Sequence, residues 1–249
     1  MSDNPVPLLG VLGGMGPLAT VDFMGKLVAE TPAEADADHV PIVVYSVPQI
    51  PSRPRAILGG GPSPLPAMLA GMRVLRQAGA QLVAMPCNTA HYWYDALVRE
   101  GGLPIVHIAD ATCEEIDALG CKGKIGILGT DATIETRIFQ ERLEARGLQC
   151  ITPSATQLDE LVLPAIEAVK GHDLERGHRL ARRACEALRS AGAEAIVLGC
   201  TELPVAIQSA KSDIARRCVD PTLALARACV RWWQSARAGY PVDTRQLPD

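Results

Sequence analysis

The sequence lacks any long, uninterrupted apolar stretch. Although 48% of its 249 residues are hydrophobic, Gly, Pro or a charged residue interrupts the apolar runs before they reach the roughly 20 residues that a membrane-spanning helix needs. The first ten residues, MSDNPVPLLG, also lack the basic region and apolar core of a secretory signal. We therefore expect a cytoplasmic protein that does not bind membranes.

The sequence also has no excess of positive charge, and its cysteines are not spaced like the ligands of a metal site. The formal net charge is -4, and Lys and Arg residues are scattered among acidic neighbours, so no footprint for nucleic acid is evident. The eight cysteines include no C-x-x-C pair and no Cys/His cluster at zinc spacing, so we predict no metal site. Most of them are expected to be small buried side chains. Small molecules are the expected ligands.

The pattern of apolar segments predicts an α/β fold with parallel sheets. Short apolar runs alternate with longer segments of helical period, as in units where helices connect parallel strands. A chain of 249 residues suits two half-sized domains. We expect four strands in each half: Leu8–Leu12, Pro41–Ser46, Leu82–Met85 and Pro104–Ile108, then Lys124–Leu128, Leu148–Thr152, Ala195–Leu198 and Arg216–Val219.

An internal repeat supports the division into halves. The segment AGAQLVAMPCNTAH, residues 78–91, matches AGAEAIVLGCTELP, residues 191–204, so that Cys87 corresponds to Cys200. GVLGG from Gly10 matches GILGT from Gly126, and ADAT from Ala109 echoes VDPT from residue 219. The repeat predicts two pseudo-symmetric α/β domains, residues 1–109 plus 217–249 with Cys87, and residues 110–216 with Cys200.

The helix before each cysteine strand, the strand that ends just before Cys87 or Cys200, has a predicted apolar face. Both helices are expected to end at a glycine, Gly79 in the first half and Gly192 in the second. The core-facing residues are expected to be Met68, Met72 and Leu75 in the first helix and Ala181, Cys185 and Leu188 in the second.

Cys87 and Cys200 are the candidate catalytic residues. Ligands of open parallel sheets bind beyond the carboxyl ends of the strands, where both cysteines are expected. A helix N-terminus there favours thiolate, so we expect each cysteine pKa to fall from its usual value of about 8.5 towards neutrality. Two thiols on opposite sides of a carbon acid could remove a proton from one face and deliver one to the other, which inverts the carbon.

Three motifs carry a resemblance to a known family. GVLGGMGPLAT, PCNTAH and GCTELP occur in this order, and together they resemble the aspartate/glutamate racemase superfamily, most closely its aspartate racemase branch. The resemblance extends from Leu8 to about Trp232. It implies two pseudo-symmetric α/β domains with the active site between them, racemisation by two cysteines without a cofactor, and a homodimer.

The resemblance also implies a set of substrate-binding residues. Asn88, Thr89, Thr130 and Thr201 look like the groups that hold the substrate's carboxylate and amino groups, and Met15 would supply loop backbone. Glu202, which follows Thr201, is also a residue type suited to hydrogen-bonding a ligand. Arg53 matches the arginine of this branch, whose planar fork can hold a side-chain carboxylate, and Lys170 looks like a second cationic contact. Glutamate racemases typically have an Asp-Ser pair where this chain has Gly13 and Gly14, and a His where it has Glu202, so aspartate is favoured.

The sequence leaves several functions open. GVLGGMG could bind a dinucleotide, although no acidic residue follows the second strand to hold a ribose. Cys87 and His91 could form a nucleophile pair for acyl transfer, but the second half has no matching histidine. Racemases of glutamate, other amino acids or hydantoins share the cysteine pair, whereas arylmalonate decarboxylases keep a single cysteine. A non-catalytic amino-acid sensor is the candidate outside enzymes.

Overall fold

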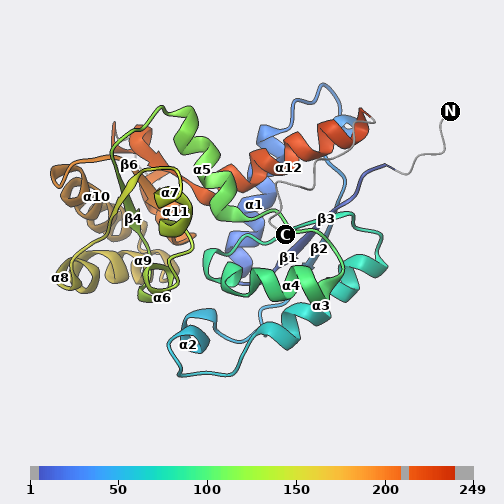
Figure 1. The fold of residues 1–249 in the computed structure, drawn as a ribbon, viewed down its shortest axis with the longest axis horizontal. Coiled ribbons are helices and arrows are strands. Elements are labelled where there is room, and N and C mark those ends of the chain that lie inside the picture. The colour runs from blue at the N-terminus through green and yellow to red at the C-terminus, as the bar shows by residue number, and fades with distance from the viewer. Residues whose placement is uncertain (1–5, 209–212, 239–249) are drawn as a thin grey trace. The chain divides into compact units, whose positions relative to one another are not determined.

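The computed structural model describes residues 6–208 and 213–238, and the chain divides into two compact units. Residues 1–111 and 225–249 form the first unit, and residues 112–224 form the second. Helices α5 (Ile108–Ala118) and α12 (Pro221–Arg237) carry the chain from one unit to the other (Figure 1). Each unit has its own parallel sheet, as expected for an α/β fold.

The sheet of the first unit is built around β1 (Leu9–Gly13). This strand pairs in parallel with β2 (Ile42–Ser46) on one side and with β3 (Leu82–Ala84) on the other, so that Leu9 lies opposite both Ile42 and Leu82. All five residues of β1 are buried. A central parallel strand covered on both faces explains why its sequence, LGVLG, has no polar residue.

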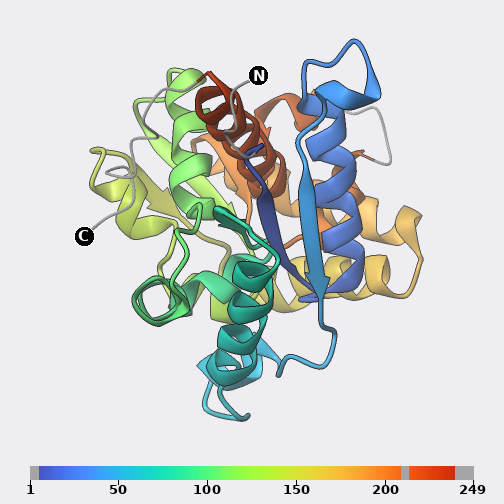
Figure 2. The same cartoon turned by 90° about the vertical axis from the view of Figure 1, so that its right-hand side faces the viewer.

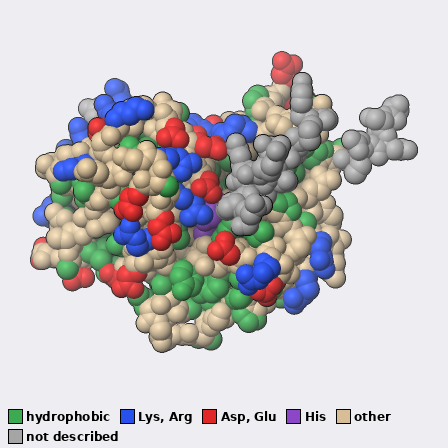
Figure 3. Space-filling model, viewed as in Figure 1, with side chains coloured by type: hydrophobic (Ala, Val, Ile, Leu, Met, Phe, Trp, Pro, Cys, Tyr) green, Lys and Arg blue, Asp and Glu red, His purple; other side chains and the backbone are tan. Residues whose placement is uncertain are grey.

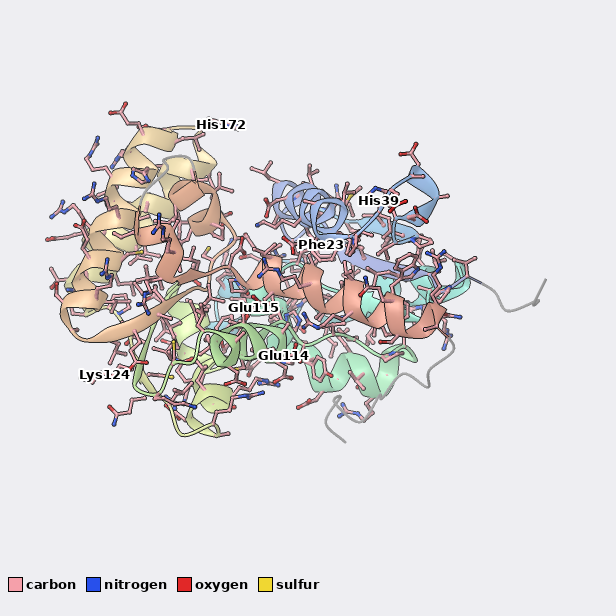
Figure 4. The ribbon with its side chains drawn as sticks, turned by 90° about the horizontal axis from the view of Figure 1, so that it is seen from above. Phe23, His39, Glu114, Glu115, Lys124 and His172 are labelled. Atoms are coloured by element: carbon pink, nitrogen blue, oxygen red, sulfur yellow. The ribbon has the colours of Figure 1, made fainter. Side chains whose placement is uncertain are left out.

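Helices cover both faces of this first sheet. Side chains alternate along a strand, so Leu12 packs with α3 (Leu65–Gln77) and α4 (Tyr94–Gly101), whereas Leu9 and Val11 pack with α1 (Pro17–Glu30) and α12. Figure 2 shows α1 and α12 beside the strands. Phe23, labelled in Figure 4, is fully buried in the α1 layer.

The second unit repeats this arrangement with one more strand. β4 (Lys124–Leu128) is central, and the order is β5 (Gln149–Ile151), β4, β6 (Ala193–Leu198), β7 (Cys218–Val219), all parallel. The main apolar cluster joins the sheet to α9 (Leu163–Lys170), α10 (Leu174–Ser190) and α11 (Glu202–Gln208). The other helices and turns are η1 (Asp36–Asp38), α2 (Arg53–Ile57), η2 (Asn88–Trp93), α6 (Asp131–Glu135), α7 (Gln140–Glu144), α8 (Ala155–Gln157), η3 (Leu158–Val162) and η4 (Asp213–Arg217).

The same glycine–leucine packing occurs in both units. A Cβ placed on Gly10 of β1 would lie 3.3 Å from the Leu75 side chain, and one on Gly126 of β4 would lie 2.9 Å from the Leu188 side chain. Each central strand therefore has a glycine where the helix leading to the cysteine strand packs. The predicted helix faces are confirmed, because Met68, Met72, Leu75, Ala181, Cys185 and Leu188 are all buried. Gly79 and Gly192 follow these helices with φ of 89° and 96°.

One predicted strand is wrong. Pro104–Ile108 is not a strand: within it Ile105 makes an isolated parallel bridge to Val83, and α5 begins at Ile108. β3 ends at Ala84, two residues before Pro86, which has no N–H to continue the ladder. The described part of the first unit thus has three strands, and the second has the expected four, with ends shifted by up to two residues.

The surface drawn in Figure 3 mixes the two signs of charge. Lys and Arg side chains lie among Asp and Glu over the described residues of this face. No helix in the described ranges has the length and apolar character needed to cross a bilayer.

We expect Leu75→Ala to lower the free energy of unfolding by about 2–5 kcal/mol, because Leu75 is fully buried against β1 and its truncation leaves a cavity. Urea titration monitored by circular dichroism measures the change. Val74→Ala on the same helix is the control, since Val74 is 37% exposed and its truncation should change stability by only about 0.5 kcal/mol. Equal losses in the two variants would contradict the packing.

Candidate active site

Cys87 lies just beyond the carboxyl end of β3. Met85 and Pro86 follow the strand, and η2 begins after the cysteine. The Cys87 N–H donates to the Met85 carbonyl over 2.8 Å, and Sγ lies 3.7 Å from the Thr89 hydroxyl oxygen. The side chain is buried, with 6% exposure. The predicted placement of this thiol at a strand end is confirmed.

The two residues after Cys87 are also buried. Asn88 and Thr89 are 4% and 7% exposed. Within the described part of the chain, the Asn88 side-chain oxygen Oδ1 is buried without a hydrogen-bond partner. A buried amide oxygen of this kind costs free energy unless a donor reaches it. Asn88 therefore offers an acceptor for a ligand N–H group.

His91 contacts the main chain of Cys87. Its Nδ1 lies 2.9 Å from the Cys87 carbonyl oxygen, and its Nε2 accepts a hydrogen bond from the Ile108 N–H over 3.2 Å. The side chain is 3% exposed. The sequence alone leaves the place of this residue open, because its second partner lies on a segment 17 positions further along the chain.

The glycine-rich segment after β1 has a structural explanation. Gly14 has φ of 88°, and a Cβ at this position would overlap the main chain of Val47, which follows β2. Its N–H donates to the Thr20 hydroxyl over 2.9 Å. Met15 is buried in the same apolar cluster as Cys87 and Ile50. Gly14 therefore allows the ends of β1 and β2 to approach closely.

Arg53 is fixed by the loop that precedes it. It is the first residue of α2, and its Nη1 donates to the Ile50 and Pro51 carbonyls over 2.9 and 2.8 Å. Ile50 belongs to the apolar cluster that contains Cys87. The guanidinium is partly buried, so the loop orients a cation near this end of the first sheet.

Cys200 occupies the equivalent strand end in the second unit. It follows β6 after Gly199, whose N–H donates to the Leu128 carbonyl over 2.6 Å. The Cys200 thiol donates to Glu202 Oε2 over 3.0 Å, and the Thr201 hydroxyl donates to the same oxygen over 3.2 Å. The carboxylate of Glu202 is thus a direct partner of this thiol.

The expected lowering of the Cys200 pKa is wrong for this structure. Burial raises the pKa of the Cys200 thiol well above its ordinary value, and the charge of Glu202 and the hydrogen bond to it raise it further. Lys170 has the opposite, smaller effect; its Nζ lies 3.9 Å from Glu202 Oε1, and its side chain is 60% exposed. A nearby carboxylate and burial favour the neutral thiol.

Thr130 is linked to the same strand end. It caps the N-terminus of α6, and its hydroxyl lies 3.2 Å from that of Thr133. Thr133 in turn donates to the Gly199 carbonyl over 3.3 Å. The structure therefore adds Thr133 to the predicted residues, as the link between the ends of β4 and β6.

The predicted site residues fall into two sets, one in each unit. Each set lies at or near the carboxyl ends of its own sheet. The first contains Met15, Arg53, Cys87, Asn88 and Thr89, and the second contains Thr130, Lys170, Cys200, Thr201 and Glu202.

Comparison with known proteins identifies the family. The Asp/Glu/Hydantoin racemase family matches residues 12–229. The chain is 28% identical over 228 residues to the broad specificity amino-acid racemase RacX of Bacillus subtilis, covering 90% of this chain and 96% of that protein. The structure of Picrophilus torridus aspartate racemase superposes with a TM-score of 0.79 at 30% identity, covering 96% and 97% of the two chains.

A second solved structure, an aspartate racemase homologue from Pyrococcus horikoshii, gives a TM-score of 0.73 at 26% identity and covers 91% of this chain and 98% of its own. The family match spans most of the sequence, including both strand-end cysteines. This chain therefore belongs to the Asp/Glu/hydantoin racemase family and is a racemase, an isomerase.

Proposed function

We propose that this protein is a cofactor-independent amino-acid racemase that acts on aspartate, with Cys87 and Cys200 as its two acid-base residues. The observation that carries the proposal is the equivalence of the two thiols. Each follows the strand next to the central strand of its sheet, on the same side in the strand order, one in each unit. We propose that the two thiols act on opposite faces of the substrate's α-carbon.

In the proposed reaction, the Cys87 thiolate removes the α-proton from one face of the substrate. The Cys200 thiol then donates its proton to the opposite face of the carbanion, so one C–H bond breaks and another forms. Cys87 ends as thiol and Cys200 as thiolate, which is the starting state for the other enantiomer. The raised pKa of Cys200 supports its role as the proton donor in the first direction.

Glu202 also affects the second direction, in which Cys200 starts as the thiolate and removes the α-proton. The thiol that forms can donate its new hydrogen to Glu202 Oε2, as the thiol does over 3.0 Å in this structure, so the carboxylate favours proton uptake by Cys200. Lys170, 3.9 Å from the other oxygen of the same carboxylate, favours negative charge on the pair.

The remaining residues suit the charged groups of an amino acid. The unpaired Asn88 Oδ1 is an acceptor for the α-ammonium group, and the hydroxyls of Thr89, Thr130 and Thr201 can donate to the α-carboxylate. Main-chain groups at Met15 would complete this part of the site. An ammonium ligand would supply the donor that the buried Asn88 oxygen lacks.

Arg53 is the proposed partner of the side-chain carboxylate. Both of its loop hydrogen bonds use Nη1, so we propose that Nη2 binds the carboxylate that distinguishes aspartate from neutral amino acids. Lys170 is the proposed second cation. The similarity to the Picrophilus torridus aspartate racemase supports aspartate. The similarity to RacX, named as a broad specificity amino-acid racemase, keeps glutamate and other amino acids as alternative substrates, and the description of the family keeps hydantoins.

Acyl transfer and dinucleotide binding have less support. Both nitrogens of His91 have main-chain partners, which disfavours a Cys87–His91 pair for acyl transfer. Gly14 is required by the approach of Val47 and Gly13 by the approach of Thr20, so neither glycine needs a phosphate to explain it. A non-catalytic sensor would bind the amino acid without exchanging its α-proton. The homodimer and the cytoplasmic location stay predictions.

We expect L-aspartate incubated with the protein in D₂O, without pyridoxal phosphate, to yield D-aspartate that carries deuterium at the α-carbon. Chiral chromatography with mass spectrometry measures both products. Glutamate, alanine and a hydantoin are assayed in parallel. Racemisation of another compound without aspartate turnover would change the substrate, and binding without exchange for every compound would favour the sensor.

The thiols are tested in the same assay. Cys87→Ser and Cys200→Ser should each lower racemisation by roughly 10²–10⁴-fold, the usual contribution of general acid-base catalysis. Cys150→Ser is the control, because Cys150 is a half-buried thiol whose hydrogen bond is to the Gln140 carbonyl. Parent activity in Cys87→Ser would refute the two-thiol mechanism.

We expect Arg53→Ala to raise KM for aspartate by roughly 10–100-fold, since a charge-assisted hydrogen bond contributes about 1.5–3 kcal/mol. The kinetics with a neutral amino acid that the protein turns over are the control for any loosening of the Ile50–Pro51 loop. Arg53→Lys keeps the charge without the fork and should recover only part of the loss. Equal effects on aspartate and the neutral substrate would remove Arg53 from the side-chain site.

We expect Glu202→Gln to lower the pKa of Cys200, because the substitution removes a negative charge that disfavours the thiolate. The rate of Cys200 alkylation by iodoacetamide, followed by peptide mass spectrometry, should then rise at a lower pH than in the parent. Glu167→Gln, at an exposed position on α9, is the matched control. An unchanged alkylation profile in Glu202→Gln would show that the two groups are not coupled.

A further inference from the structure

His91 links Cys87 to a second segment of the first unit. It lies four residues after Cys87, and its buried ring spans the space between the Cys87 carbonyl and the Ile108 N–H. The two hydrogen bonds, 2.9 and 3.2 Å long, connect the turn after β3 to the first residue of α5.

These partners determine which nitrogen carries the hydrogen. The Ile108 N–H can only donate, so Nε2 must be the acceptor, and the Cys87 carbonyl can only accept, so Nδ1 must be the donor. The ring is therefore the neutral Nδ1–H tautomer. The Val106 carbonyl is the more distant neighbour of Nε2, at 3.4 Å, and would accept a hydrogen only if Nε2 were protonated.

Neighbouring aromatic rings pack around the imidazole. The His107 ring centre lies 4.8 Å away, and the Tyr94 ring is stacked at 6.4 Å. The Tyr94 hydroxyl donates to the Ile105 carbonyl, and His107 Nδ1 accepts from the Ala109 N–H over 3.1 Å. The rings around His91 are thus themselves bonded to the segment that contains its second partner.

We propose that His91 is a positioning residue for the Cys87 thiol, an inference that rests on the proposed function. The N–H of Cys87 is bound by Met85 and its Sγ contacts Thr89, and His91 holds the remaining polar group, the carbonyl. Fixing the peptide after Cys87 fixes the backbone that directs its side chain. A misplacement of about 1 Å in a reacting group can cost about 10²-fold in rate.

The second unit supports Cys200 in a different way. The repeat places Pro204 opposite His91, and Pro204 has no side-chain hydrogen bond to give. There Glu202 binds the thiol itself. Loss of His91 should therefore disturb proton transfer on the Cys87 face of the substrate and leave the Cys200 face intact.

The test compares His91→Ala with His91→Asn. The Asn side-chain amide reaches about as far as Nδ1 and can restore the donor to the Cys87 carbonyl, so Asn should recover part of the activity that Ala loses. We expect His91→Ala to lower kcat about 10–100-fold with KM for aspartate near the parent value. Exchange of the α-proton in D₂O should slow for one enantiomer, the one that also loses exchange in Cys87→Ser.

His172→Asn is the matched control. His172 is exposed in the turn between α9 and α10 (Figure 4), with φ of 63°, a conformation that Asn tolerates. Thermal unfolding of each variant separates folding defects from positioning. Equal slowing of exchange for both enantiomers, or no recovery in His91→Asn when it is as stable as the parent, would overturn the proposal.

Two measurements do not depend on racemase activity. Nitrogen-15 NMR of the His91 ring should show a protonated Nδ1 and an unprotonated Nε2, and the opposite pattern would overturn the assignment. Alkylation of Cys87 by iodoacetamide should change in His91→Ala and return towards the parent rate in His91→Asn. If the parent racemises no amino acid, the proposed function fails, while an unchanged Cys87 alkylation rate in His91→Ala would overturn the positioning role on its own.

Discussion

The end of a parallel strand leaves main-chain groups without ladder partners, and the structure depends on how these groups are satisfied. After β3, Pro86 has no N–H, and the Cys87 N–H turns back to the Met85 carbonyl. After β6, the Gly199 N–H bonds to Leu128 and its carbonyl accepts from Thr133. In both units these bonds satisfy the main chain where the strand ends, and a cysteine lies at the sheet's carboxyl end, where parallel sheets bind their ligands. The proposed acid-base chemistry follows from this position.

The two units share a backbone plan but support their thiols differently. Glycines in β1 and β4 each admit a leucine from the helix that leads to the cysteine-bearing strand end, α3 in the first unit and α10 in the second, so the two sheets are built alike. Beyond them, Cys87 is held by hydrogen bonds to its main chain and lies near a hydroxyl, whereas Cys200 is bonded through its sulfur to a carboxylate. A two-base racemase needs one thiol protonated while the other is ionised. Unequal surroundings favour that distribution before substrate binds, because the Glu202 charge favours the protonated form of Cys200.

Much of this architecture can be predicted from the sequence, because the internal repeat and the spacing of apolar residues are visible within short stretches of it. The central strands, the buried helix faces and the strand-end positions of both cysteines follow from them. Pro104–Ile108 differs because α5 begins at Ile108 and takes the end of the apolar run into a helix. The Cys200 pKa moves opposite to the sequence-based expectation because the thiol is buried and the Glu202 carboxylate lies two residues away and bonds to it. His91 could not be placed from sequence, since its role depends on an N–H 17 positions further along the chain.

The way in which Arg53 and Lys170, the two candidate cations, are held affects which substrates the two thiols can act on. Acid-base chemistry at an α-carbon does not itself distinguish aspartate from glutamate or alanine. Selectivity therefore has to come from groups that contact the substrate's side chain. Arg53 is partly buried and held by two loop carbonyls, so its fork is oriented before any ligand arrives. Lys170 is 60% exposed, and its partner Glu202 also serves Cys200. A fixed cation penalises a side chain of the wrong length more than a flexible one does. We therefore expect Arg53 to contribute more to the substrate range than Lys170, which also acts through the charge of the Cys200–Glu202 pair.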